Sequence, residues 1–278
     1  MSERPQLGRI AIRPPIISLG IKDGLVDEGP ERIFTSGIQS VLRGYLDRKF
    51  TNPDVIAAGR SNLAELFSAN ILPYLLSQPL GVRMATQKED ETVRDRLRDY
   101  QKGTDIIMTD KSDVPLMGVD VFLGNPKKRG YWINTIDKVE RVAPKRNPML
   151  NKLKCPGFNS RMQIPVVVFA LSMGSYNTAG QNLTAFEFFD DVLRPELVHN
   201  GSVNLEDILE QMPNLIPSLT YALRVGMRAC RQSLTAEIRN HPNSLMRDTV
   251  VQAITRLNEM LQIVKGNTNS KLHFHSVH

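Results

Sequence analysis

The stretch DIIMTDKSDVPLMGVDVFL, residues 105–123, decides the fold. It contains two apolar runs of strand length, Asp105–Thr109 and Val114–Leu123, which are separated by the turn-forming residues Asp110–Asp113. Two such runs joined by a short polar turn predict adjacent antiparallel strands. The second run contains one acidic residue, Asp120, among apolar neighbours. An acid in that setting either bonds to a nearby backbone group or lysine, or belongs to a functional site.

Two further apolar runs extend the predicted sheet. Tyr131–Ile136 follows the break at Gly124–Pro126 and predicts the third strand of an antiparallel meander. Ile164–Ser172, which reads IPVVVFALS, is continuously apolar, as is typical of a central strand covered on both faces.

Helices are predicted before and after these strands. Asn62 and Glu65, three residues apart, form a capping box that opens a helix. Two long helices are predicted over Ser218–Asn240 and Ser244–Lys265. The second has an apolar seam for a neighbouring helix, either of the same chain or of a second subunit in a homo-oligomer. The predicted fold class is α/β (α+β), a mixed sheet with an antiparallel meander flanked by helices, plus a helical C-terminal appendage.

Proline content and helical periodicity divide the chain into four predicted parts. Residues 1–32 form a proline-rich, irregular N-terminal arm, and residues 33–199 form the α/β core. Residues 200–265 form the helical appendage, and residues 266–278 form a flexible, polar tail.

The overall composition is ordinary for a globular protein, since 41% of the 278 residues are hydrophobic and 23% are charged. No apolar run approaches the ~20 residues needed to cross a bilayer, and the polar N-terminus lacks the apolar stretch of a signal peptide. These features predict a cytoplasmic protein with no membrane partner. The two cysteines, Cys155 and Cys230, are too few for a disulfide framework and predict free thiols.

The positive charge of the chain is concentrated in one segment. Between Gly124 and Arg161 there are ten basic and two acidic residues, a local charge of +8 on a chain whose net charge is +6. Such a concentration predicts an anionic partner, and nucleic acid is the partner expected. The predicted nucleic-acid contacts are Lys127, Lys128, Arg129, Lys145, Arg146, Lys152 and Lys154.

The order of predicted elements over residues 62–197 resembles the core of the PD-(D/E)XK nuclease superfamily. That core is a helix, a three-stranded meander, and then another helix and strand. The resemblance implies a hydrolase, a metal-dependent DNA endonuclease in which carboxylates hold Mg²⁺. It also implies a lysine, two residues after the second acid, that stabilises the charge developing on the phosphate.

Two alignments with this family are open. In the first, Asp120 matches the metal-binding aspartate of the second strand, and Glu65 matches the glutamate of the preceding helix. Asn134 then stands at the acid position of the third strand and Ile136 at the lysine position. Lys138 lies two residues further on the same face, because side chains alternate along a strand. The resemblance thus implies Asp120, Asn134 and Lys138 as catalytic residues.

In the second alignment, Asp105 is the first acid and metal ligand, and Asp120 is the second. Phe122 then stands where the lysine belongs. Neither alignment contains the lysine in its place, and this favours an alternative function. The alternative is a non-catalytic nucleic-acid-binding or protein-assembly module that uses the same basic segment.

Three arginines of the first long helix, Arg224, Arg228 and Arg231, are spaced by four and three residues and therefore share one helical face. Guanidinium groups suit bidentate contacts with phosphate. Pairing with the acidic residues of the run EFFDD, residues 187–191, explains the same arginines equally well.

Overall fold

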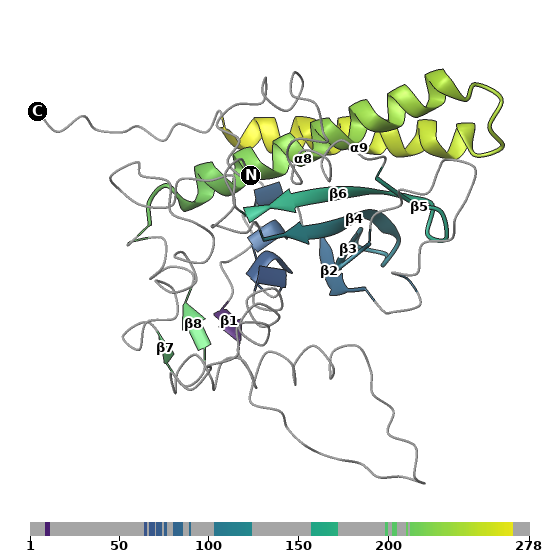
Figure 1. The fold of residues 1–278 in the computed structure, drawn as a ribbon. Coiled ribbons are helices and arrows are strands. Elements are labelled where there is room, and N and C mark those ends of the chain that lie inside the picture. The colour runs from purple at the N-terminus through teal and green to yellow at the C-terminus, as the bar shows by residue number, and fades with distance from the viewer. Residues whose placement is uncertain are drawn as a thin grey trace, which may run out of the picture.

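A five-stranded mixed sheet forms the centre of the structure, which is a computed structural model. In order across the sheet, the strands are β2 (Gly81–Met84), β3 (Ile106–Thr109), β4 (Pro115–Phe122), β6 (Ile164–Ala170) and β5 (Phe158–Asn159). Neighbouring strands run antiparallel, except that β4 and β6 are parallel (Figure 1). The predicted mixed sheet with an antiparallel meander is confirmed.

The described part of the chain comprises residues 9–11, 64–65, 67–69, 71–73, 75–76, 80–85, 89, 103–123, 157–171, 198–199, 202–204, 210 and 212–268. The strand predicted over Tyr131–Ile136 lies outside these residues.

The turn between β3 and β4 is built by Asp110, as the polar residues between the two apolar runs predict. The Asp110 side chain, through Oδ1, accepts hydrogen bonds from the backbone N–H groups of Ser112 (2.7 Å) and Val114 (3.0 Å). Asp113 adopts a left-handed conformation, with φ of 59°, which Asp tolerates better than most residues. This local chemistry reverses the chain and sets β3 antiparallel to β4.

The first strand of the meander is β2, which the sequence analysis did not predict. Its four residues, GVRM, are only partly buried, and an edge strand this short carries little periodic signal. The described meander is therefore β2–β3–β4, and the strand that contains Asp120 is its third strand rather than its second.

Two long helices, α8 (Leu215–Asn240) and α9 (Arg247–Thr268), lie side by side along one face of the sheet (Figure 1). Their bounds agree with the two predicted helices to within a few residues. Gly226 of α8 permits close contact with the sheet, because a Cβ atom there would collide with the carbonyl oxygen of Val168 in β6. The two helices therefore share one hydrophobic core with the strands.

The apolar seam of α9 is buried within this same chain. Val250, Leu257 and Val264 are fully buried, and α9 packs against α8 and β6. The neighbouring helix predicted for this seam is therefore α8, and the seam packs against elements of the same chain. Within the described residues, no helix is both long and apolar enough to span a membrane.

The helix predicted to open at Asn62 is present in the described residues between Ala64 and Leu76, all of which are helical. Its buried side chains include Phe67 and Ile71, which join the same core as the sheet. Pro73 lies within the helical residues.

A second, three-stranded antiparallel sheet corrects two sequence predictions. Its strands lie in the order β1 (Arg9–Ala11), β8 (Ser202–Asn204) and β7 (Val198–His199). The predicted irregular arm thus contains a strand, and the predicted all-helical region begins with another. These pairings join distant parts of the chain through two or three residues each, so no local periodicity reveals them.

Candidate functional site

Adjacent strands bring two acidic residues next to each other. Ile106 of β3 is the antiparallel partner of Val119 in β4. Asp105 precedes Ile106 and Asp120 follows Val119, so the two aspartates lie side by side where the strand pairing ends. The backbone N–H of Asp105 donates a 2.9 Å hydrogen bond to the carbonyl oxygen of Val119, which ties the two segments together at this point. The structure thus brings together the two acids of the second alignment.

The Asp105 side chain is held against β4. Its Oδ2 atom accepts a 2.7 Å hydrogen bond from the backbone N–H of Val121. The preceding residue, Thr104, is buried over Gly118, where a Cβ atom would lie 2.9 Å from the Thr104 Cγ2. Gly118 therefore gives Thr104 room to lie flat on β4, and this contact places Asp105 at the strand edge.

Asp120 points away from the two long helices. Val167, the parallel partner of Val119, faces α8, since its Cγ1 would lie 3.0 Å from a Cβ atom at Gly226. Val119 shares that face, and successive side chains along a strand point to opposite faces. The Asp120 side chain therefore lies on the face opposite α8, and the residue is 4% exposed. A carboxylate removed from water in this way interacts strongly with any cation that reaches it.

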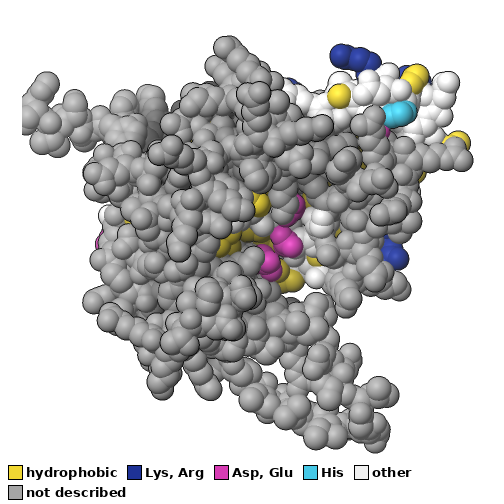
Figure 2. All heavy atoms as spheres, viewed as in Figure 1, with side chains coloured by type: hydrophobic (Ala, Val, Ile, Leu, Met, Phe, Trp, Pro, Cys, Tyr) yellow, Lys and Arg dark blue, Asp and Glu magenta, His cyan; other side chains and the backbone are white. Residues whose placement is uncertain are grey.

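Figure 2 shows acidic side chains near the middle of the viewed face, bordered by hydrophobic ones. Glu65, the third acid of the predicted metal site, is helical and half-buried. Among the described residues, no group of three or more His, Cys, Asp or Glu side chains is arranged to hold a metal ion. The carboxylate site in the described structure is therefore the pair Asp105 and Asp120.

Phe122 is the residue that the second alignment sets at the position of the lysine. It lies two residues after Asp120 on β4, on the same face of the sheet, and packs against the hydrophobic core. No ammonium group is supplied from this position.

The remaining predicted site residues lie outside the described part of the chain. They are the predicted catalytic residues Asn134 and Lys138 and the predicted nucleic-acid contacts Lys127, Lys128, Arg129, Lys145, Arg146, Lys152 and Lys154.

The sequence predicts Asp120 on the second strand of the meander, whereas β2 makes the strand that contains Asp120 the third. The available signal was weak: Gly81–Met84 contains two apolar residues, Val82 and Met84, in alternation with Arg83. Once β2 is counted, Asp120 stands on the third strand of the meander, and Asp105 directly precedes the middle strand, β3. Comparisons of this chain with protein-family models, with curated proteins and with solved structures gave no match.

Proposed function

We propose that this protein is a metal-dependent phosphodiesterase of the nuclease type, which holds Mg²⁺ at Asp105 and Asp120 and acts on nucleic acid. The observation that carries the proposal is the position of the two aspartates, side by side at the end of the pairing between β3 and β4, two neighbouring strands of an antiparallel meander. A helix precedes this meander, and the later strand β6 runs parallel to its third strand. The core to which the sequence has its resemblance likewise has a helix, a meander and a later strand, and its second helix would fall among residues 124–156, which lie outside the described part of the chain.

The chemistry of the pair fits a hard divalent cation. Two neighbouring carboxylates repel each other, most strongly where one of them is shielded from water, as Asp120 is. Mg²⁺ prefers oxygen ligands and is commonly held by one or two carboxylates together with phosphate oxygens and water. A cation bound there supplies charge to polarise a phosphate and to activate a water molecule.

A second candidate function is nucleic-acid binding without cleavage, and Phe122 is the observation that favours it. An apolar side chain in the lysine position removes one source of charge stabilisation during phosphoryl transfer. The basic segment between Gly124 and Arg161 serves either function, because phosphate contacts do not require catalysis.

The two candidates are separated by measuring metal binding and cleavage on the same preparations. Titration calorimetry with Mn²⁺ and Mg²⁺ is combined with a cleavage assay on plasmid, linear and single-stranded DNA and on RNA. The variants are Asp105→Asn and Asp120→Asn. The matched control is Asp113→Asn, which makes the same exchange at an exposed turn where Asn tolerates the positive φ of 59°.

The enzyme is supported if both aspartate variants lose metal binding and cleavage while Asp113→Asn retains them. Metal binding at the two aspartates with no cleavage of any substrate would support the binding module instead. Failure of the wild-type protein to bind either metal, with or without nucleic acid present, would refute a metal site at this pair.

A further inference from the structure

Helix α8 carries a row of arginines on its outer surface. Arg224, Arg228, Arg231 and Arg239 follow one another at spacings of four, three and eight residues, which place them on one side of the helix. These four residues are called the arginine row below. The helix contains one acidic residue, Glu237, which is 3% exposed and lies 3.4 Å from His241. The side of α8 that carries the arginines therefore has no acid from the helix itself, and the acidic run of residues 187–191 lies outside the described part of the chain.

The charges of the arginine row are not neutralised within the described structure. None of its four members forms an ion pair with a described residue. Arg231 donates a 3.2 Å hydrogen bond to the neutral side-chain oxygen of Asn258 in α9. The Nε atom of Arg224 is buried and has no hydrogen-bond partner among the described residues. Burial, followed by the nearby charge of Arg228, lowers the pKa of Arg224 below its usual value.

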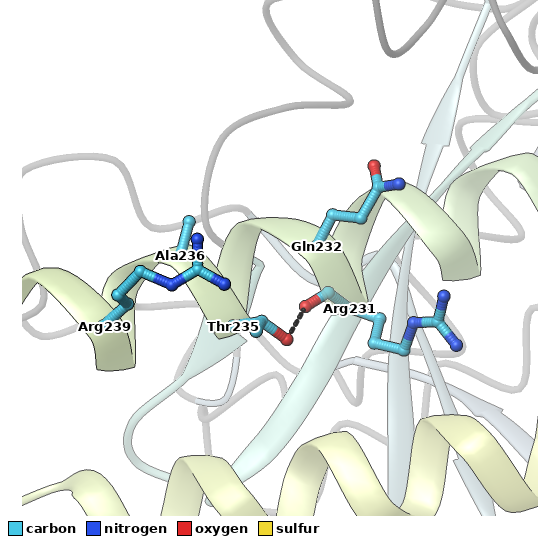
Figure 3. A pocket seen from close by; sticks show the side chains of 5 residues that line it. All are labelled: Arg231, Gln232, Thr235, Ala236 and Arg239. Carbon is cyan, nitrogen blue, oxygen red and sulfur yellow. Dashed lines mark hydrogen bonds between the residues drawn. The ribbon is translucent and has the colours of Figure 1, made fainter.

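A shallow hollow of about 310 Å³ lies along the C-terminal half of the row. It is lined by Arg231, Gln232, Thr235, Ala236 and Arg239 (Figure 3). The side chains of Arg231 and Arg239 run along the helix in the same direction and do not converge on one point. The Thr235 hydroxyl donates a 2.8 Å hydrogen bond to the carbonyl oxygen of Arg231, so its hydrogen is already engaged within the helix. The hollow thus offers charge spread along a line, which suits an extended anion better than a single small one.

The arginine row is remote from the aspartate pair. Gly226 faces the sheet, so the arginines lie on the side of α8 away from the sheet. Asp120 lies on the face of the sheet that points away from α8. Because the sheet and α8 both stand between them, one phosphate group cannot contact the arginine row and the two aspartates together.

We propose that the arginine row binds the phosphate backbone of a nucleic acid, as a surface separate from the aspartate pair. Arg224 and Arg239 are fifteen residues apart, or about 22 Å along the helix at 1.5 Å per residue, so the row spans several consecutive phosphates. All four cations are arginines, whose planar guanidinium groups form bidentate contacts with phosphate oxygens. Binding of a polyanion also relieves the repulsion between Arg224 and Arg228.

A nucleic acid fits this surface better than an acidic protein does. Protein interfaces have an apolar centre that is depleted of charged residues. Among the described residues, the large hydrophobic side chains that are exposed are Val114, Leu245 and Val251, and none belongs to α8. The surface is thus charged and lacks an apolar centre. This proposal does not depend on metal binding or catalysis at Asp105 and Asp120.

The test is fluorescence anisotropy with labelled 30-nucleotide single-stranded and duplex DNA and RNA, at a series of salt concentrations. The variant Arg228→Gln/Arg239→Gln removes two charges whose side chains make no hydrogen bond or ion pair in the described structure. The control Lys111→Gln/Arg256→Gln removes the same charge from the β3–β4 turn and from α9.

The expected result is an affinity about tenfold lower for the arginine variant, with a slope of log K against log salt reduced by about 1.5 to 2. The control keeps the wild-type slope. Equal losses in the arginine variant and the control would overturn the proposal, because binding would then follow net charge alone. The proposal would also be overturned if poly-glutamate bound more tightly than any nucleic acid and the arginine variant lost that binding. The arginine row would then bind an acidic polypeptide.

Discussion

The carboxylate of Asp105 accepts a 2.7 Å hydrogen bond from the backbone N–H of Val121. If β3 were longer, this N–H would bond to a backbone carbonyl group of β3. The Asp105 carboxylate replaces that acceptor at the point where the β3–β4 hydrogen bonding ends. Asp105 therefore closes the end of the β3–β4 pair and at the same time places a negative charge beside Asp120. The two roles predict different responses to substitution.

Asp105→Ala should lower the free energy of unfolding by about 1–3 kcal/mol, because the N–H of Val121 loses its acceptor in a largely buried place. Asp105→Asn keeps an acceptor oxygen and should cost clearly less, although it removes the charge. Urea denaturation followed by circular dichroism measures both values. Equal losses in the two variants would mean that the charge, rather than the hydrogen bond, supports the fold.

Gly226→Ala should destabilise the protein, although the same exchange within an exposed helix stabilises by about 1 kcal/mol. The added Cβ would collide with the carbonyl oxygen of Val168, and α8 would have to move off the sheet. Overpacking of this kind costs about 1–3 kcal/mol.

The matched control is Ala236→Gly at an exposed position of the same helix, which should cost about 1 kcal/mol through propensity alone. Thermal and urea unfolding compare the two variants. A stability gain in Gly226→Ala would show that α8 does not pack as closely on β6 as the structure has it.

Asn159→Asp should be strongly destabilising, by about 3 kcal/mol or more, because a carboxylate replaces a buried donor. The Asn159 amide donates to the carbonyl oxygen of Glu89 (2.7 Å) and to the Thr104 hydroxyl (3.3 Å). Its Oδ1 atom accepts from the N–H groups of Arg161 and Met162, both at 3.1 Å. The substitution replaces the hydrogen bond to the Glu89 carbonyl oxygen with a repulsion between two oxygen atoms.

Asn258→Asp is the control for this exchange, because its side-chain oxygen already accepts a hydrogen bond from Arg231 at an exposed site. It should leave the unfolding midpoint in urea unchanged or slightly raised. A similarly small effect of Asn159→Asp would contradict the buried hydrogen-bond network around Asn159.

Cys230 should be inert toward thiol reagents in the folded protein. Its side chain is fully buried, and its Sγ lies 3.4 Å from the carbonyl oxygen of Gly157. In the Cys155→Ser variant, where Cys230 is the remaining thiol, reaction with a disulfide reagent should occur only as denaturant unfolds the protein. Rapid reaction without denaturant would show that the contact between α8 and the β5 region opens readily.

The central strands and the long helices were predictable because each is specified by its own residues. The runs at Ile106–Thr109, Pro115–Phe122 and Ile164–Ala170 are apolar over a strand length, and the seam of α9 repeats at helical spacing. The turn at Asp110 also follows from local chemistry, since a short polar side chain bonds to the backbone just after it.

The candidate site was predictable only in part. Asp105 and Asp120 stand out in the sequence as acids at a strand end and within an apolar strand. Whether Asp120 belongs to the second or the third strand depends on β2, whose four partly buried residues resemble a loop when taken alone. The sequence therefore left two alignments open, and the pairing of β2 with β3 makes β4, which contains Asp120, the third strand of the described meander.

The sequence by itself determined the apolar strands, the two long helices and the arginines that share one face of α8, because periodicity and turn chemistry are local properties. Only the tertiary structure decided that Asp105 lies beside Asp120, that α9 finds its partner in α8, and that the arginine row faces away from the aspartate pair. Those relationships depend on strand register and on how closely Gly226 lets α8 approach β6. Both are set by contacts between residues far apart in the chain, which no local pattern encodes.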